Sequence, residues 1–364
     1  MILPGATIGL LGGGQLGRMF TIAARTMGYE VMVLDPDPES PAAVFATEHI
    51  CGPYTDTDAL ARLAEECAAV TTEFENVPAS SLHSIAQHIP VRPSAAAIHI
   101  ARDRILEKET ISNIGLDTVD YHVIQSESDL DLALQQIPLP AILKTATLGY
   151  DGKGQTTLRA DATDLPDAFK KASEFAWAEV GAAPSILEGF VPFECEISII
   201  GARGATGEVQ LFDPAENVHR NGILKTSTTP ANVPKETIAK ASKVATTLLE
   251  SLNYVGVIGV EFFVLKNGDV LVNEFAPRVH NSGHWTSNAC AVSQFEQHIR
   301  AVAGWPLGDP SRHSNAVMEN LIGDEANAWS ALAGQAQTGV HLYGKHEARP
   351  GRKMGHVTKI SARE

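Results

Sequence analysis

Two glutamates on either side of a short turn are the first residues whose types and spacing could perform chemistry. They lie in VIGVEFFVLKNGDVLVNEFAPR, residues 257–278, where two apolar runs flank Asn267-Gly268, a dipeptide typical of a β-hairpin turn. A two-residue turn there pairs Glu261 with Glu274 on neighbouring strands. Two facing carboxylates repel each other, and a divalent cation such as Mg²⁺, which prefers oxygen ligands, would relieve the repulsion. Because the strands are otherwise apolar, the pattern favours a buried metal site over an exposed hairpin with both acids in solvent.

A glycine-rich stretch, GYDGKGQ at residues 149–155, is the second candidate. Its glycines leave the backbone adaptable, while Tyr150, Asp151 and Lys153 supply a phenol, an acid and a base. Lys144 ends the apolar run AILK that precedes this stretch. From the sequence alone, Lys144 is either an edge lysine that reaches solvent or a ligand of a phosphate.

Glu188 and Glu196 stand eight residues apart in SILEGFVPFECEIS. At the end of a strand, Glu188 could accept hydrogen bonds from a ribose or from an adenine amino group. Taken singly, each acid is equally compatible with a solvated surface position.

A second glycine motif lies near the N-terminus, where GGGQLGR follows the apolar run ATIGLL. Gly12, Gly14 and Gly17 fit the G-x-G-x-x-G pattern between a strand and a helix, and Asp35 ends the next strand, as in dinucleotide-binding folds. The alternative is a close strand-to-helix turn whose amides bind some other phosphate, or nothing.

The elements that must position these residues fall into three units. Residues 1–100 alternate strands and helices, which predicts a doubly wound parallel sheet. Residues 101–184 contain the end of a long helix predicted over 94–115 and a small α+β unit, and residues 185–364 begin strand-rich. Arg104 and Lys108 are four residues apart in the predicted helix and therefore share a face.

Composition narrows the class of protein. The chain has 28 Lys and Arg against 43 Asp and Glu, a formal net charge of −15, so we expect neither nucleic acid nor a membrane surface as a partner. Four widely spaced cysteines without a CxxC pair predict buried, reduced thiols in a cytoplasmic protein. Residues 345–364 are locally basic, which suits one small anion.

Together these motifs resemble the ATP-grasp ligases, which hold ATP between two α+β units and activate a carboxylate as an acyl phosphate. The motifs GLLGGGQLGRM, TTEFENVP, GYDGKGQ, NEFAPRVHNSGHWT and RPGRKMGH are similar, in this order, to the N5-carboxyaminoimidazole ribonucleotide synthetases. The resemblance spans residues 9 to 356. It implies an ATP-grasp fold with an N-terminal doubly wound (pre-ATP-grasp) domain, a small central lid domain and a C-terminal α+β domain. The implied reaction uses ATP, Mg²⁺ and bicarbonate to carboxylate 5-aminoimidazole ribonucleotide in purine biosynthesis.

The resemblance also assigns roles on the nucleotide side of the site. Glu261 and Glu274 match the metal ligands, although Ala276 stands where many ATP-grasp enzymes have a ligating Asn, so the metal would rely more on water and phosphates. The residues assigned to ATP are Arg104, Lys108, Lys144, Gly149, Tyr150, Asp151, Gly152, Lys153, Gly154, Gln155, Glu188, Gly189, Phe190, Val191, Glu196, His219, Asn273 and Glu274.

On the acceptor side, the glycine turn offers amides at a helix N-terminus, Glu73 could accept a hydrogen bond from the amine, and the basic segment suits a phosphate or carboxylate. Lys153 would neutralise the transferred phosphate in a lid that excludes water. Asp151 would take a proton from the amine and Tyr150 would position the amine, with Lys353 as a further catalytic candidate. The substrate residues implied are Gly14, Gln15, Leu16, Glu73, Arg278, Asn281, Lys345, Arg349, Arg352 and Lys353.

Three other functions remain open at this point. Another ATP-grasp ligase, such as a formate-dependent ribonucleotide transformylase or a biotin carboxylase-like unit, would have the same fold and a different acceptor. A NAD-dependent oxidoreductase would explain the glycine turn and Asp35 but not the two facing glutamates. A nucleotide-sensing module without catalysis is the third. The family resemblance also suggests a homodimer.

Overall fold

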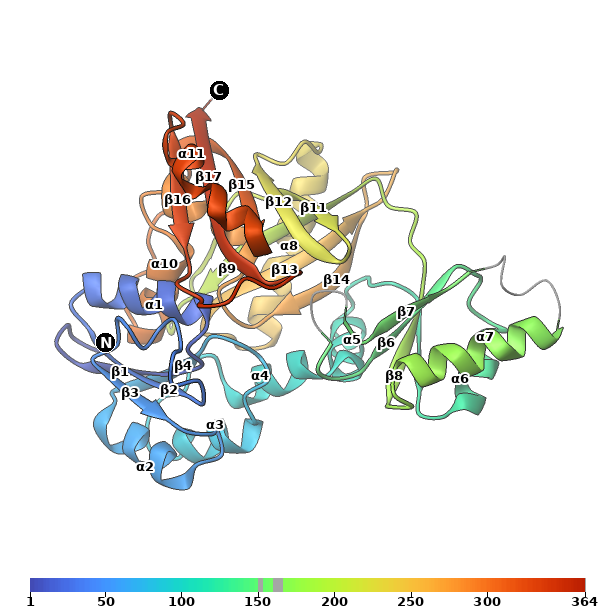
Figure 1. Ribbon diagram of the computed structural model, residues 1–364, viewed down its shortest axis with the longest axis horizontal. Coiled ribbons are helices and arrows are strands. Elements are labelled where there is room, and N and C mark those ends of the chain that lie inside the picture. Colours follow the sequence, from blue (N-terminus) through green and yellow to red (C-terminus); the bar gives the residue numbers. More distant parts are fainter. Residues whose placement is uncertain (150–152, 160–165, 364) are drawn as a thin grey trace.

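The computed structural model describes residues 1–149, 153–159 and 166–363 and contains three sheets. The small sheet with α6 and α7 projects from one side of the largest sheet, and the N-terminal sheet lies on the other side (Figure 1). Among the described residues, no helix is long and apolar enough to cross a membrane.

The N-terminal unit is a four-stranded parallel sheet in the order β3-β2-β1-β4, which confirms the predicted doubly wound arrangement. Side chains cap two of its helices: Asp56 accepts hydrogen bonds from the first amides of α2, and Ser94 does so for α4. The elements are β1 Thr7–Leu11, α1 Gln15–Thr26, β2 Glu30–Asp35, β3 Glu48–Cys51, α2 Thr57–Glu66, β4 Ala69–Thr72, α3 Ala79–Ala86 and α4 Ala95–Arg102.

The single helix predicted over residues 94–115 is wrong, because two helices occupy this range. Asp103 leaves helical geometry after α4 and caps the next helix, α5 (Arg104–Asn113), by accepting hydrogen bonds from the amides of Ile105 and Leu106. Arg104 is therefore the first residue of a helix whose start is fixed by the preceding side chain.

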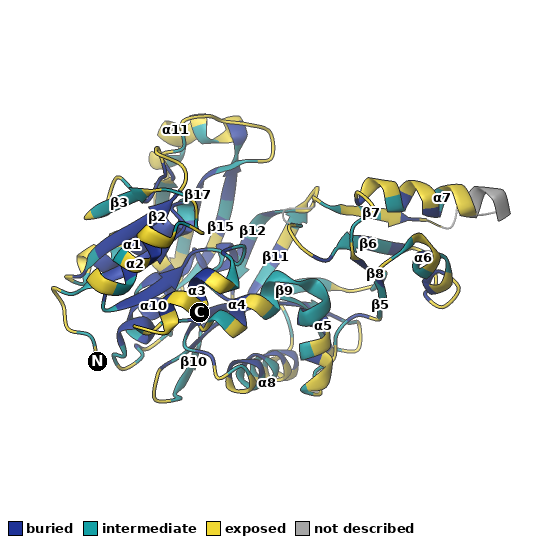
Figure 2. Cartoon of the chain, turned by 90° about the horizontal axis from the view of Figure 1, so that it is seen from below, coloured by how far each residue is buried: buried dark blue, intermediate teal, exposed yellow. Residues whose placement is uncertain are grey.

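The small sheet is antiparallel, in the order β5-β8-β6-β7, and α6 and α7 accompany it. The strand β8 pairs with β5 and β6. The unit boundary expected between residues 184 and 185 therefore separates β8 from the sheet to which it belongs. In Figure 2 the helix α7 is mainly exposed, whereas β8 is largely buried and β6 is partly buried. The elements are β5 Tyr121–Ile124, α6 Glu127–Ala133, β6 Ala141–Thr145, β7 Gln155–Leu158, α7 Pro166–Glu179 and β8 Ser185–Gly189.

The largest sheet has nine strands among the described residues, in the order β14-β13-β9-β11-β12-β15-β17-β16, with β10 paired to β9. Its helices and two 3₁₀ turns pack around it. The elements are β9 Cys195–Arg203, β10 Val209–Leu211, β11 Ala215–Arg220, β12 Ile223–Thr229, α8 Lys235–Ser251, β13 Gly256–Val264, β14 Val270–Ala276, η2 Asn281–Gly283, α9 Thr286–Ala289, α10 Gln294–Ala303, β15 Ser314–Ile322, η3 Gly323–Ala328, α11 Trp329–Ala333, β16 Thr338–Leu342 and β17 Lys353–Ala362.

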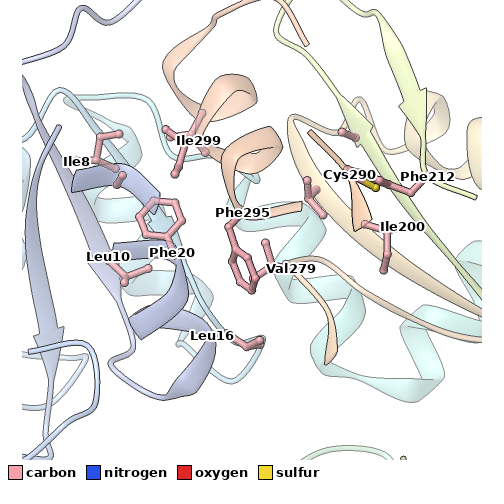
Figure 3. Close-up of a cluster of buried hydrophobic side chains, with 14 of the residues drawn as sticks. Ile8, Leu10, Leu16, Phe20, Ile200, Phe212, Val279, Cys290, Phe295 and Ile299 are labelled. Carbon is pink, nitrogen blue, oxygen red and sulfur yellow. The ribbon is translucent and has the colours of Figure 1, made fainter. Parts of the chain in front are cut away.

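The N-terminal sheet and the largest sheet share one hydrophobic core. Phe20 of α1 lies beside Phe295 and Ile299 of α10, and each is at most 3% exposed (Figure 3). His298 of α10 also joins the two sheets, because its ring nitrogens contact Thr71 Oγ1 at 2.8 Å and the amide of Val257 at 2.9 Å. This packing fixes the ends of β1 and β4 relative to β13.

The cysteines agree only partly with the prediction. All four are free thiols, but Cys51 is exposed at the end of β3, whereas Cys67 and Cys290 are buried. The sequence alone did not distinguish the exposed position, because EHIC is a short strand with polar residues at its start.

Candidate functional site

A cavity of about 630 Å³ opens where the three sheets meet. The N-terminal unit contributes Gln15, Leu16 and Glu73, and the small sheet contributes Lys144 and Gln155. The other sequence-predicted residues that line this cavity are Arg104, Gly149, Glu196, His219, Glu261, Asn273, Glu274, Arg278, Asn281 and Lys353.

The predicted pairing of Glu261 with Glu274 is confirmed, but the turn that leads to it differs from the expected one. The hairpin closes over three residues, since the amide of Leu265 donates to Asp269 O at 2.8 Å and that of Gly268 to Leu265 O at 2.8 Å. A bulge between Glu261 and Phe262 then adds one residue to β14, which restores the predicted register.

The two facing glutamates differ in their surroundings. Glu274 receives an ion pair from Arg104 Nη1 at 2.9 Å, and this cation lowers its pKa even though burial opposes ionisation. Burial, reinforced by the charge of Glu274, raises the pKa of Glu261. Glu274 is therefore paired with a guanidinium, whereas Glu261 has the ring of His280 at 3.7 Å as a neighbour.

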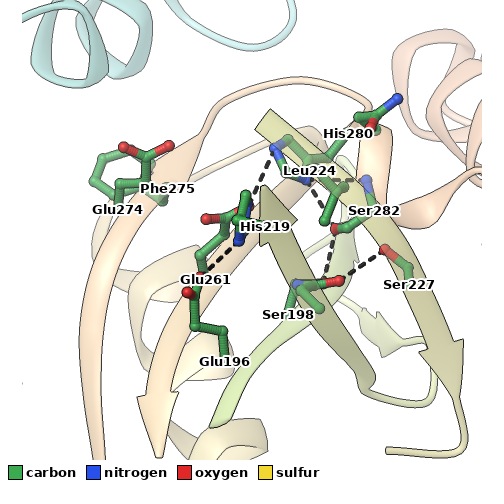
Figure 4. Close-up of polar contacts among 12 residues, drawn as sticks. Glu196, Ser198, His219, Leu224, Ser227, Glu261, Glu274, Phe275, His280 and Ser282 are labelled. Carbon is green, nitrogen blue, oxygen red and sulfur yellow. Dashed lines mark hydrogen bonds and ion pairs between the residues drawn. The ribbon is translucent and has the colours of Figure 1, made fainter. Parts of the chain in front are cut away.

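Glu196 and His219 complete this corner of the cavity, on strands β9 and β11 beside β13 (Figure 4). His219 Nδ1 lies 2.9 Å from Glu196 Oε2, and the hydrogen bond raises the pKa of His219 although burial lowers it. One ligand atom each from Glu196, His219 and Glu261 lie within 4.8 Å of one another. With Glu274 opposite, this concentration of carboxylate oxygens fits a divalent cation.

Lys108 and Lys144 flank Glu188, but only Lys144 lines the cavity. Lys108 is 0% exposed, and its ammonium contacts Thr118 Oγ1 at 2.9 Å, Asn273 O at 2.8 Å and Glu188 Oε1 at 3.1 Å. Burial opposes ionisation of Glu188, yet the two lysines lower its pKa to about 2. The structure thus assigns Lys108 to the support of β14, whereas the sequence predicted a phosphate ligand.

Glu107 is a residue of the cavity that sequence reasoning missed. It is 2% exposed, accepts a hydrogen bond from the amide of Phe275 at 2.7 Å, and its pKa is raised by burial and by the charge of Glu274. Its place next to Lys108 on α5 was the only available clue.

Apolar lining residues were also missed. Ile142 lies two residues before Lys144 in β6 and therefore points to the same side of that strand. Both residues line the cavity. Phe193 and Phe263 stack with ring centroids 4.7 Å apart and an interplanar angle of 13°. By contrast, Gly189, Phe190 and Val191 are not among the described residues that line the cavity, and Phe190 is 53% exposed.

The glycine turn is occupied by carboxylates of the chain itself. Glu73 accepts hydrogen bonds from the amides of Gly14 and Gly17, the latter at 2.5 Å, and burial raises its pKa. Asp35 accepts from the amide of Gly13 at 2.7 Å and from the hydroxyl of Tyr54 at 2.7 Å. The amides that would hold a dinucleotide pyrophosphate are thereby satisfied, which argues against the NAD alternative.

Arg278 and Asn281 reach the cavity edge with their polar groups already engaged. Arg278 pairs with Glu75 through Nε at 2.6 Å and Nη2 at 3.3 Å, which ties β14 to the end of β4. The amide groups of Asn281 and Asn320 bond to each other in both directions, and Asn320 is 0% exposed.

In the basic segment, Lys353 is the predicted residue that lines the cavity. Lys345 Nζ donates to the carbonyl of Lys353 at 2.8 Å, Arg349 pairs with Glu347, and Arg352 Nη1 donates to Glu347 O at 2.9 Å. Lys345, Arg349 and Arg352 are not among the described residues that line the cavity.

Part of the glycine-rich stretch falls outside the described residues, namely Tyr150, Asp151 and Gly152. Of the remainder, Gly149 and Gln155 line the cavity, Lys153 is exposed, and Gly154 has a φ of 69°, a conformation that favours glycine. The structure therefore puts both ends of this stretch at the cavity.

Comparisons with known proteins agree with this arrangement. The ribonucleotide synthetase preATP-grasp domain family matches residues 5–102, the ATP-grasp domain family residues 109–295, and the phosphoribosylaminoimidazole carboxylase C-terminal domain family residues 316–364. A Brucella melitensis protein named N5-carboxyaminoimidazole ribonucleotide synthase is 51% identical over 361 residues, which cover 99% of this chain and 98% of the relative.

Two solved structures have the same fold over nearly the whole chain. An ADP complex of an N5-carboxyaminoimidazole ribonucleotide synthetase aligns with a TM-score of 0.93 at 41% identity, covering 99% of this chain and 94% of that one. An Aspergillus clavatus N5-carboxyaminoimidazole synthase with ADP and 5-aminoimidazole ribonucleotide aligns with a TM-score of 0.90 at 30% identity, covering 98% and 94%.

Proposed function

Because this chain belongs to the N5-carboxyaminoimidazole ribonucleotide synthase family, we propose how its own residues divide the work of that family's reaction. The chain is an ATP-grasp ligase that carboxylates 5-aminoimidazole ribonucleotide with the use of ATP, a step of purine biosynthesis. Bicarbonate is the proposed carboxyl donor. A bicarbonate oxygen attacks the γ-phosphorus of ATP and releases ADP, and the substrate amine then attacks the carbon of carboxyphosphate, releasing phosphate and losing a proton.

The nucleotide lies between the small sheet and β13–β14 in this proposal. Lys144 and Arg104 hold its phosphates, since both of these basic side chains line the cavity. Glu196 and His219 form hydrogen bonds with the ribose. The backbone of residues 188–191 binds the adenine. Ile142 and the Phe193–Phe263 stack supply an apolar wall against which the base lies.

Glu261 and Glu274 are the proposed Mg²⁺ ligands, and the cation would neutralise negative charge on the phosphates when bound. Arg104 keeps Glu274 ionised for this role, because the ion pair lowers the pKa of that carboxyl. Glu107 and Lys108 hold the backbone of β14 on either side of Glu274 through the amide of Phe275 and the carbonyl of Asn273.

The acceptor ribonucleotide lies on the N-terminal side, against Gln15, Leu16 and Glu73. Glu73 positions the exocyclic amine, and Lys353 attracts the substrate's anionic group or the carboxyphosphate. Lys153 and Tyr150 close over the transferred phosphate from the glycine-rich stretch, and Asp151 takes the proton from the amine. Gly14, Arg278, Asn281, Lys345, Arg349 and Arg352 support the walls around this acceptor.

We also propose that the protein is a cytoplasmic homodimer. Each chain would contain three functional units: residues 1–100 for the acceptor, 101–184 for the lid, and 185–364 for the metal-binding hairpin and basic segment. Free thiols and a role in purine biosynthesis support the location. The oligomeric state is measured directly by light scattering of the purified chain.

One observation carries the proposal most strongly: Lys144, Arg104, Glu261 and Glu274 meet in one cavity that also reaches Glu73. The test is ADP release by the purified enzyme in Mg²⁺ and ATP, with bicarbonate and 5-aminoimidazole ribonucleotide each present or omitted. ADP release that requires both co-substrates is expected. Release that ignores bicarbonate, or that formate stimulates instead, would overturn the proposed carboxyl donor.

A further inference from the structure

The loop that follows β14 is clamped by the buried side chain of Gln294, the first residue of α10. Gln294 is 0% exposed, its Oε1 accepts a hydrogen bond from the amide of His280 at 2.8 Å, and its Nε2 donates to the carbonyl of His280 at 2.7 Å. The side-chain amide thus pairs with the His280 backbone in both directions, as a neighbouring strand would. This pairing fixes the position of His280 beside the cavity.

The ring of His280 is oriented by a second set of contacts. Ser198 Oγ donates to Ser282 Oγ at 2.7 Å, which leaves the Ser282 hydroxyl proton for His280 Nδ1 at 2.9 Å, and the Ser282 amide also points at Nδ1. Nδ1 therefore accepts, and the proton of the neutral ring lies on Nε2. Nε2 faces Glu261 Oε1 at a distance of 3.7 Å (Figure 4).

The strand that carries Glu261 leaves room for this ring. Gly259 precedes Glu261 by two residues and so points to the same side of β13. A Cβ atom at Gly259 would lie 2.6 Å from Cβ of His280. Only glycine at this position lets His280 stand next to the Glu261 carboxylate.

From these contacts we propose that His280 is a positioning residue for Glu261, and that Gln294 holds His280 in place for this task. At 3.7 Å the N–H at Nε2 is beyond hydrogen-bond distance but attracts one oxygen of Glu261 and leaves the other for the cation, as second partners do more tightly for carboxylate ligands. The inference rests on the proposed metal-binding role of Glu261. It adds His280 and Gln294, of which Gln294 lies outside the cavity, to the residues that determine the affinity for the cation.

The same helix provides a matched control. Gln297 of α10 is also 0% exposed and pairs with a loop backbone in both directions, with Nε2 to Gly308 O at 2.8 Å and Gly308 N to Oε1 at 2.8 Å. Its loop is not among the described residues that line the cavity. Gln294→Met and Gln297→Met therefore each remove a two-way pairing with a loop backbone, and only the first releases His280. Gln294→Met also removes the contact of Nε2 with His284 Nδ1 at 3.2 Å.

The experiment measures Mn²⁺ binding by electron paramagnetic resonance, with ADP present, in the full-length wild type, Gln294→Met, Gln297→Met, His280→Gln and Glu261→Gln. Gln294→Met and His280→Gln are expected to weaken Mn²⁺ binding by about tenfold or more. Gln297→Met is expected to bind like the wild type while its melting temperature falls as much as that of Gln294→Met. If Gln294→Met does not fold, Gln294→Glu replaces it, since it keeps the acceptor and loses only the donor.

The outcomes separate this inference from the proposed function. Weaker Mn²⁺ binding in Glu261→Gln with normal binding in Gln294→Met and His280→Gln would overturn the positioning role alone. Unchanged binding in Glu261→Gln would remove the metal-binding role itself, and the inference with it. Equal loss in Gln294→Met and Gln297→Met would overturn the inference, because destabilisation alone would then explain the effect.

Discussion

Lys108 lies against Glu188 in the interior, with 3.1 Å between Nζ and Oε1, and the two residues are 0% and 3% exposed. Lys144 reaches the same carboxylate from the cavity side. One buried acid therefore joins a lysine that supports the backbone to a lysine that lines the cavity. We expect loss of Lys108 and loss of Lys144 to have different consequences, so the two roles can be tested separately.

We expect Lys108→Met to lower stability and Lys144→Met to lower affinity for ATP. Removing Lys108 leaves part of a buried ion pair and two hydrogen-bond acceptors without a partner, at a cost on the order of 3 kcal/mol. Lys144 is partly exposed, so its loss costs about 1 kcal/mol of stability but removes charge from the cavity. Urea unfolding and the KM for ATP, measured for both variants, test this. A Lys108→Met enzyme of normal stability with a raised KM would restore Lys108 as a phosphate ligand.

Acid should remove the stabilising effect of Glu188. Its pKa is about 2 in the folded chain, below the ordinary value of 4.5, so its carboxylate stabilises the folded state above pH 4.5 and loses that effect as the pH falls toward 2. The shift corresponds to about 3 kcal/mol. The difference in unfolding free energy between the wild type and Glu188→Gln is therefore expected to be constant near neutral pH and to shrink below pH 4.5. A difference that grows on acidification would contradict the ion pair.

The β13–β14 hairpin shows how far sequence reasoning reached and why. Facing of Glu261 and Glu274 was predicted from a two-residue turn, whereas the turn has three residues and a bulge in β14 compensates. The longer turn and the bulge offset each other, and the pattern of apolar residues reveals neither of them. The pairing itself could be predicted, because it is fixed by which face of the hairpin is buried. The predicted pairing of the two carboxylates was therefore correct, and the predicted path of the backbone between them was not.

Burial of charged groups is the other property that the sequence did not specify. Arg104 and Lys108 share a helix at a spacing of four, yet one faces the cavity and the other lies beneath β14. Likewise, the break between α4 and α5 depends on the capping by Asp103, a residue that also tolerates a helix interior. These outcomes depend on tertiary contacts, which spacing along one helix does not contain.

Glu274→Gln is expected to lower kcat/KM by about a hundredfold or more, because the variant loses a proposed metal ligand and leaves Arg104 uncompensated. Removal of Mg²⁺ with a chelator should abolish turnover, and added Mg²⁺ should restore the wild type at lower concentration than the variant. Glu319→Gln is the control, since Glu319 lies on β15 of the same sheet and pairs with Lys225 outside the cavity. Equal Mg²⁺ requirements in Glu274→Gln and the wild type would refute the metal role.

Gly14→Ala tests whether the glycine turn and Glu73 act as one unit at the acceptor site. A Cβ atom at Gly14 would lie 2.6 Å from Glu73 Oε1, so the carboxylate must leave the amides of Gly14 and Gly17 that it now accepts from. If Glu73 positions the substrate amine as proposed, its displacement removes one charge-assisted hydrogen bond. We then expect the KM for 5-aminoimidazole ribonucleotide to rise about tenfold or more while the KM for ATP stays unchanged. Gly52→Ala is the matched control in the same unit, because the nearest atom to its Cβ would be 3.5 Å away. A parallel rise in both KM values would instead indicate that the turn supports the whole cavity, since α1 also packs on the core that holds β13 in place.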